Sequence, residues 1–174
     1  MRFVDAVETY ALDPTPAHLA DLQSTIMEAP GYDPRVVISP AAKPLIDRGD
    51  YEDAVELLAG LMPGAFLSPS AHALLFVAHN ALGNTDDARR EQHFSRMAMT
   101  AIRTSGDGTA ERPYTVLHVE DEYDVLTALG AQSISQVLER TRDGANDVHA
   151  LADGSSVHFR LAWVSADDIG GAAR

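Results

Sequence analysis

The chain lacks cysteine, and only one of its 174 residues is tryptophan. Without thiols it can form no disulfide, thiolate zinc site, iron–sulfur cluster or cysteine nucleophile. It also lacks an uninterrupted apolar run of about 18 residues, so we expect no membrane-spanning helix. The first residues, Met1–Glu8, mix charged and apolar side chains and do not resemble a signal peptide. These absences predict a cytoplasmic protein.

Basic residues are scarce, with 13 Lys and Arg against 26 Asp and Glu, which gives a formal net charge of −13. Such a field repels the phosphate backbone of nucleic acids and anionic membrane surfaces. We therefore expect no nucleic-acid partner and no membrane partner. Solubility explains the acidic surface most simply, and attraction of a basic protein partner is the alternative. The oligomeric state stays open.

Apolar residues make up 45% of the chain, enough for a folded core. Up to residue 104 their spacing is helical, and Pro follows Thr or Ser at three helix starts, Thr15, Ser39 and Ser68. The fifth helix is apolar on most of its surface and should be central. The predicted helices cover residues 2–12, 15–28, 39–48, 51–61, 69–82 and 85–104.

An internal repeat lies within these helices. Gly49 and Gly83 are 34 residues apart, and so are Ala54 and Ala88. This spacing matches the tetratricopeptide (TPR) period, in which Gly permits a tight turn and Ala allows two helices to approach closely. Two such units cannot bury their faces alone, so we expect flanking elements to cover them.

After residue 104 the pattern changes to a small α/β region, residues 105–165. Strands are expected at 114–119 and near 134–138, a helix at 120–129, and a hairpin of 147–151 with 156–164 around Asp153-Gly154. Residues 166–174 read as a frayed tail. The predicted class is α+β: TPR-like antiparallel helical hairpins in 1–104, packed on an α/β unit with a mainly antiparallel sheet. In the last strand the alternation places Val157, Phe159, Leu161 and Trp163 inward, and His158 and Arg160 outward.

One set of sequence segments consists of Thr104–Thr109, Arg112–Val116 and Asp121–Leu126, supported by Gly49–Tyr51, Phe66–Pro69, Gln136, Asp147 and the strand at Phe159. Together these segments resemble the DUF4919 family of bacterial proteins. The resemblance covers most of the chain and implies a TPR-like helical front half. The family name carries no established function, so it assigns no catalytic or binding residue. It marks these signature residues, whose role it leaves open: Gly106, Asp107, Gly108, Thr109, Glu122 and Tyr123.

Two polar segments of the second region invite a functional interpretation. The glycine-rich turn at 105–109 could expose backbone N–H groups to an anion, but no Lys follows as in a P-loop, and a simple chain-redirecting turn explains it better. The acidic residues 120–124, together with Asp107, could bind a hard cation. Their spacing is not that of an EF-hand, and acidic residues in a first helical turn complement the helix dipole. We assign neither a metal nor a cofactor.

Three histidines of the helical region form the remaining cluster. His72 and His79 share a helix face, and His93 lies on the next helix, which could make a metal or general-base site. No H-E-x-x-H pattern supports this, so hydrogen-bonded core histidines are the preferred interpretation. No nucleophile motif is present, and we name no catalytic residue.

The leading hypothesis is a protein–protein interaction module that uses a groove of its helical repeats. One alternative is an enzyme with a site where the two halves meet, near Asp107, Glu122 and Tyr123. Another is an immunity-type protein that neutralises a partner.

Overall fold

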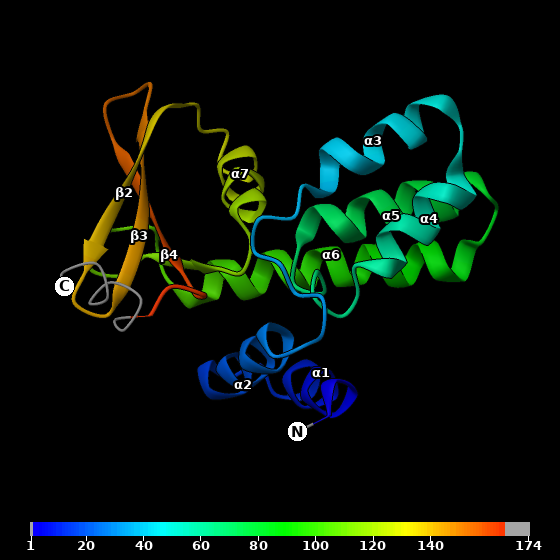
Figure 1. Cartoon of the computed structure of the whole chain (residues 1–174), viewed down its shortest axis with the longest axis horizontal. Helices are drawn as coiled ribbons and strands as arrows, with labels where there is room; N and C mark the ends of the chain where they lie inside the picture. Colours follow the sequence, from blue (N-terminus) through cyan, green and yellow to red (C-terminus); the bar gives the residue numbers. More distant parts are fainter. Residues whose placement is uncertain (1, 166–174) are drawn as a thin grey trace. The chain divides into compact units, whose positions relative to one another are not determined.

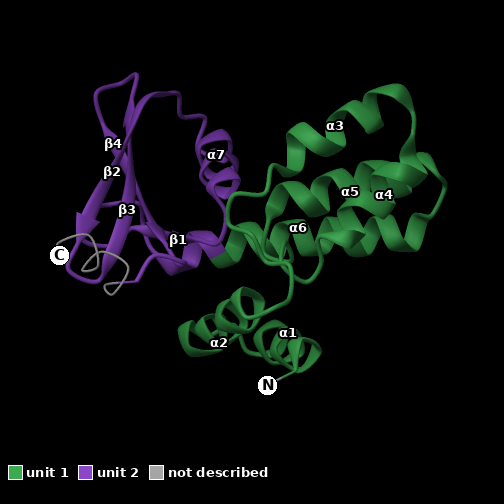
Figure 2. Cartoon of the chain, in the orientation of Figure 1, with its two compact units in different colours: residues 1–101 green, residues 102–174 purple. Residues whose placement is uncertain are grey.

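The computed structural model describes residues 2–165, and the predicted frayed tail, 166–174, lies outside them. Within the described part, seven helices and a four-stranded sheet confirm the α+β class (Figure 1). The chain divides into two units, residues 1–101 and 102–174 (Figure 2). The elements are α1 (Phe3–Leu12), α2 (Pro16–Met27), α3 (Ile38–Arg48), α4 (Tyr51–Gly60), α5 (Pro69–Ala81), α6 (Thr85–Ser105), β1 (Tyr114–Val116), α7 (Val119–Ala128), β2 (Ser133–Thr141), β3 (Gly144–Leu151) and β4 (Ser156–Leu161).

Two of the three predicted helix starts are confirmed. Thr15 is the N-cap of α2, where its hydroxyl accepts a hydrogen bond from the His18 backbone N–H at 3.2 Å. Ser68 occupies the N-cap position of α5, and Pro follows at the first helical position in both helices. The proline fixes φ near its helical value and removes an N–H that would have no partner in the first turn.

The third predicted start is wrong by two residues. The N-cap of α3 is Val37, so Ser39 lies inside the first turn and does not cap it. The fully buried Ile38 side chain belongs to the core, which holds this earlier turn in place. Pro40 is compatible with that position because the first turn of a helix needs no intrahelical N–H donor there.

Both repeat glycines adopt the conformation that the pattern requires. Gly49 has φ +81° and Gly83 φ +77°, and each lies directly between two helices. Ala54 is 0% exposed and Ala88 is 3% exposed, as expected for small residues where helices approach closely. The turn chemistry of the 34-residue pattern is therefore present in α3–α4 and again in α5–α6.

The core of the first unit lies among α3, α4 and α5, which contact one another in pairs. Ile38 and Leu58 are fully buried there, and each such side chain contributes about 1.5–3 kcal/mol relative to an exposed one. A second cluster joins α1 to α6: the ring of Phe66 makes edge contacts with Phe3, Phe94 and His72. The two clusters draw on α1, α3, α4, α5 and α6, and α2 packs on α1.

The sheet of the second unit has the order β1-β4-β3-β2. β2 pairs with β3 and β3 with β4, both antiparallel, whereas β1 pairs in parallel with β4. The predicted sheet was mainly antiparallel, and the parallel β1–β4 pair makes it mixed. That pairing joins segments more than 40 residues apart in the sequence, Tyr114 opposite Phe159, which local periodicity does not report.

Two strand ends differ from the prediction. β1 ends at Val116 because Val119 already starts α7, so 117–119 do not continue the strand. β4 ends at Leu161, which places Trp163 in a turn and not in the inward row. Within β4, Val157, Phe159 and Leu161 are buried and Arg160 is exposed, as the alternation predicted. The shorter strand leaves only three inward side chains in that row.

Candidate functional site

The glycine-rich turn is closed by its own hydrogen bonds. The N–H groups of Asp107 and Gly108 both donate to the carbonyl of Arg112, at 2.8 and 3.1 Å. The Asp107 carboxylate accepts from the Thr109 N–H at 3.1 Å and from its hydroxyl at 2.7 Å. These Thr109 bonds hold the pKa of Asp107 below its usual range. The N–H donors that an anion would need are therefore already used, which favours a chain-redirecting turn.

The two glycines of this turn are required for different reasons. Gly108 has φ +79°, where side chains are disfavoured, and lies against the ring of Tyr114. Gly106 has no positive φ, but a Cβ there would collide with the carbonyl oxygens of Arg112 and Pro113. Only Gly108 of the two therefore has the left-handed backbone conformation, and Gly106 is required for the close approach of the chain.

Replacing Gly106 with Ala is expected to destabilise the second unit by about 2–3 kcal/mol, because the backbone of Pro113 must move to admit a methyl group. Urea unfolding followed by the fluorescence of the single tryptophan, Trp163, measures this change. Gly130→Ala is the control: unlike Gly106, Gly130 has positive φ, but no atom lies within 4 Å of its added Cβ. A Gly106→Ala cost no larger than that of Gly130→Ala would show that the close approach is unimportant.

The residues of the predicted junction site lie in separate environments. Asp107 is exposed, and its bonds are to Thr109 and Arg112 of its own turn. Glu122 and Tyr123 are neighbours in α7, where Glu122 is 0% exposed and Tyr123 is 47% exposed. Within residues 2–165, no recorded hydrogen bond or ion pair joins Asp107 to either of them.

The first turn of α7 directs two carboxylates inward. Asp121 accepts a hydrogen bond from the His118 backbone N–H at 3.0 Å and so closes the start of the helix. Glu122 points to the sheet, where β3 presents Asp147 and His149 in its inward-facing row, opposite Phe159 and Val157 of β4. Helix start and strand alternation together build a buried acid–histidine cluster, which consists of Glu122, Tyr123, Ser133, Gln136, Asp147 and His149.

Short hydrogen bonds connect this acid–histidine cluster. Glu122 Oε2 lies 2.7 Å from His149 Nε2, and the other ring nitrogen lies 2.9 Å from the Ser133 hydroxyl. On the outer side, the Tyr123 hydroxyl donates to Gln136 at 2.8 Å, and the Gln136 amide donates to Asp147 at 2.7 Å. α7, β2 and β3 each contribute members, so the cluster fixes the helix against the sheet.

Electrostatics favours a protonated Glu122. Burial, followed by the negative charge of Asp147, raises the pKa of Glu122 to about 9. Burial also lowers the pKa of His149, against the opposing charge of Asp147. Glu122 and His149 therefore share one proton near neutral pH, held mainly by the carboxyl group. His149 and Ser133 were not among the predicted residues; an inward polar residue within the predicted strand 147–151 was the available signal.

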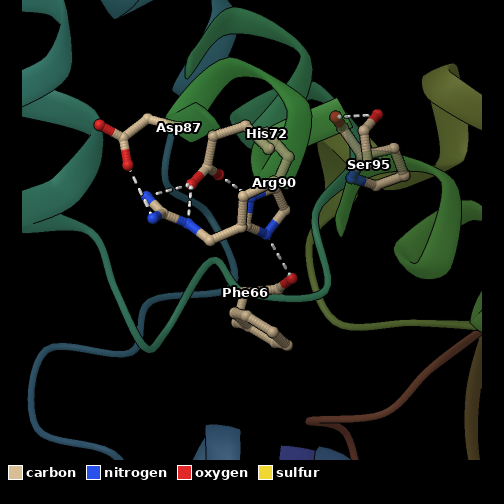
Figure 3. Close-up of polar contacts among 7 residues, drawn as sticks. Phe66, His72, Asp87, Arg90 and Ser95 are labelled. Carbon is tan, nitrogen blue, oxygen red and sulfur yellow. Dashed lines mark hydrogen bonds and ion pairs between the residues drawn. The ribbon is translucent and has the colours of Figure 1, made fainter. Parts of the chain in front are cut away.

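The three predicted histidines do not form one site. His72 is 2% exposed: its Nδ1 lies 2.7 Å from Glu91 Oε2, and its Nε2 donates to the carbonyl of Phe66 at 2.8 Å (Figure 3). Arg90 bridges Glu91 to Asp87 in the same view. His93 is exposed on α6. For His72 the preferred interpretation, a hydrogen-bonded core histidine, is confirmed.

A pocket of about 280 Å³ lies in the first unit, between the end of α1 and α6. Its α6 side consists of residues at positions i, i+3, i+4 and i+7, one face of the helix. The floor is apolar, with Met97 half-buried, and Arg96 and His93 are exposed at the rim. The lining residues are Tyr10, Ala11, Pro14, His93, Arg96, Met97 and Thr100.

The described residues contain neither a metal-ligand group nor a membrane-spanning helix. Within 2–165, no group of three or more His, Asp or Glu side chains is placed to hold a metal ion. In the same range, no helix combines the length and the apolar composition needed to cross a membrane. The acidic residues of α7 instead divide between capping, the acid–histidine cluster and the helix surface.

Comparison of the chain with protein-family models gives no match, and comparisons with curated proteins and with solved structures give none either. The function is therefore argued from the residues alone.

Proposed function

We propose that this chain is a cytoplasmic protein-interaction module whose helical front half binds a segment of a partner protein. The observation that carries the proposal is the pocket between α1 and α6, which combines an apolar floor with a cationic rim. Its volume of about 280 Å³ accommodates one or two side chains of a partner, as expected for an anchor residue at an interface.

A TPR-like arrangement of the helices is part of the same proposal. In its support, the repeat glycines precede α4 and α6 with similar positive φ, and the repeat alanines are buried in the first turn of each of these helices. Stacked hairpins present a helix face to partner segments along their length. Membership of the DUF4919 family is part of this proposal and rests on the signature segments of the sequence.

The chemistry of the pocket indicates what the partner segment carries. Within the described residues no carboxylate pairs with Arg96, although the chain has twice as many acidic as basic residues. An apolar side chain would displace water from Met97 and Tyr10, and an adjacent carboxylate or carbonyl oxygen would accept from the Arg96 guanidinium. The net charge of −13 disfavours partners with many acidic residues, so we expect one such acceptor beside the apolar anchor.

A displayed peptide library selected on the full chain tests this proposal. The affinity of the selected peptides should fall at least tenfold with Met97→Ala or Arg96→Glu. Met97→Ala removes the apolar contact and Arg96→Glu the cationic one, each worth about 1.4 kcal/mol or more. Isothermal titration of the synthesised peptides measures the change.

Matched controls are available on the same helix. Met99→Ala removes an equally large side chain that does not line the pocket, and Arg103→Glu reverses a charge about two turns further on. Equal losses with Met97→Ala and Met99→Ala would argue that selected peptides bind elsewhere. Failure to select any peptide on a folded chain would count against the proposal.

The enzyme alternative has one observation in its favour, the raised pKa of the buried Glu122. The hydrogen bonds weigh against it. While Glu122 keeps its proton and donates to His149 Nε2, the one ring proton of neutral His149 lies on Nδ1 and donates to Ser133. Ser133 then has no base to accept its proton, so the interaction proposal is preferred. An immunity-type role would be one form of that proposal, with a toxin as the partner.

A further inference from the structure

β2 is an edge strand, and its outer edge carries no neighbouring strand among the described residues. The sheet order places it beside β3 alone, and eight of the nine residues from Ser133 to Thr141 oppose a β3 residue, all but Ile134, where the register shifts. Every residue after Ser133 is exposed. An edge of this length presents backbone N–H and C=O groups that match another extended strand.

The side chains of β2 are unusually apolar for such an edge. Ile134 is 67% exposed, and Val137 and Leu138 are each 56% exposed. Leu138 lies opposite Asp147 and therefore on the α7 side of the sheet, whereas Val137 lies opposite Val148 on the other side. Apolar groups on both faces of one edge favour burial by a strand that continues the sheet, since a strand added there covers both.

The charge of β2 also differs from that of the whole chain. Glu139 and Arg140 balance within the strand, and Arg142 and Asp143 balance in the turn that follows. The chain as a whole carries 26 acidic and 13 basic residues, so this edge is a neutral segment of an acidic protein. A second copy of the chain can approach here with less repulsion than at an average part of its surface.

We propose that β2 pairs with β2 of a second copy, antiparallel and centred on Val137, to give a continuous eight-stranded sheet. Val137 is the midpoint of Ser133–Thr141, so this register uses the full strand in both copies. A contact across a two-fold axis must be self-complementary, and two identical strands paired antiparallel about their midpoint meet this requirement.

The register brings no like charges face to face. Val137 meets its own copy, Leu138 meets Gln136, and each charged residue meets an uncharged one. The remaining opposed pairs are Arg140 with Ile134, Glu139 with Ser135, and Thr141 with Ser133.

Single cysteines test both pairing and register, because the chain has no cysteine of its own. Val137→Cys should form a disulfide-linked dimer under mild oxidation, since opposed Cα atoms of an antiparallel ladder lie about 4.5–5.5 Å apart. Ser135→Cys alone should not, because its two copies would be roughly 14 Å apart. Ser135→Cys mixed with Glu139→Cys should link as a heterodimer.

Sedimentation of the unmodified chain provides the second measurement. We expect a monomer–dimer equilibrium that tightens with added salt, because salt screens the repulsion between two copies of charge −13. Val137→Lys should weaken it at least tenfold by placing two ammonium groups opposite each other, whereas Val37→Lys, at an apolar residue 61% exposed in the first unit, should not.

Three outcomes would overturn the proposal. The first is a chain that remains monomeric at its highest soluble concentration. The second is equal cross-linking of Val137→Cys and Ser135→Cys, and the third is dimers that persist with Val137→Lys. The peptide-binding test concerns α1 and α6, so either result can fail without the other.

Discussion

Replacing His72 with Leu is expected to lower the free energy of unfolding of the first unit by about 3–5 kcal/mol. The change removes the partner of Glu91 Oε2 and leaves this carboxylate, 6% exposed, with the half-exposed Arg90 as its remaining cation. Breaking a buried pair from one side costs about 3–5 kcal/mol because the remaining charge loses its compensation, and Arg90 places the expected loss at the lower end of that range.

The two ring nitrogens of His72 have different partners. The Phe66 carbonyl can only accept, so Nε2 is the donor in that bond. On the other side, burial raises the pKa of Glu91, but the bonds from His72 and Arg90 outweigh burial and the net direction is down. Glu91 is therefore an ionised acceptor that lies 2.7 Å from Nδ1.

The pH dependence of this effect has a fixed sign. The folded pKa of Glu91 lies below its unfolded value. The contacts of ionised Glu91 therefore contribute to stability above the unfolded pKa, and this contribution is lost as pH falls through the folded pKa. Chemical denaturation followed by circular dichroism at the helical band measures it, since α1–α6 supply most of the helix. His93→Leu, at an exposed histidine, is the control and should change stability by about 0.5 kcal/mol or less.

Glu91→Gln provides a graded variant. The amide oxygen still accepts from His72 Nδ1, so we expect a smaller loss than with His72→Leu, of about 1–2 kcal/mol. If His72→Leu destabilised the unit no more than His93→Leu does, the buried pair would have no net structural role.

The parts of the fold that could be predicted from sequence depend on local chemistry. Thr15-Pro16, Ser68-Pro69, Gly49 and Gly83 act through their own backbone and its neighbours, and the structure confirms each. The parallel pairing of β1 with β4 could not be predicted, because it depends on which distant segments meet. The start of α3 was misplaced because burial of Ile38 outweighs the apparent cap at Ser39.

The same distinction applies to the candidate site. Glu122 could be singled out from a motif, and His72 from its helix position, but neither pattern names the partner. His149 meets Glu122 only because α7 packs on the inward face of β3, and Glu91 meets His72 only because α6 packs on α5. Contacts between side chains 27 and 19 positions apart depend on packing that no local spacing records.

Replacing Glu122 with Gln is expected to remove about 3 kcal/mol of pH dependence from the stability of the second unit. In the folded chain, Glu122 and His149 together hold one proton up to pH about 9, the pKa of Glu122. In the unfolded chain they hold none above pH 6.5, the ordinary value for His.

The pH range in which the stability changes, and the direction of that change, follow from this proton count. Between the lowered pKa of folded His149 and pH 6.5, the unfolded His149 holds one proton, the folded pair also holds one, and the pair adds no pH dependence. Between pH 6.5 and about 9 the folded state holds one more proton, so its stability falls as pH rises, by roughly 1.4 kcal/mol per unit. The result does not depend on which of the two side chains carries the proton.

Urea unfolding monitored by Trp163 fluorescence at several values between pH 6.5 and 9 tests this, at concentrations where the chain is monomeric. Wild type should lose stability across the window, whereas Glu122→Gln, whose amide cannot ionise, should change much less. Glu139→Gln, at an exposed carboxylate of β2, should retain the wild-type slope. Equal slopes for wild type and Glu122→Gln would mean that the folded pair holds no more protons than the unfolded chain in this window, with Glu122 ionised beside a neutral His149.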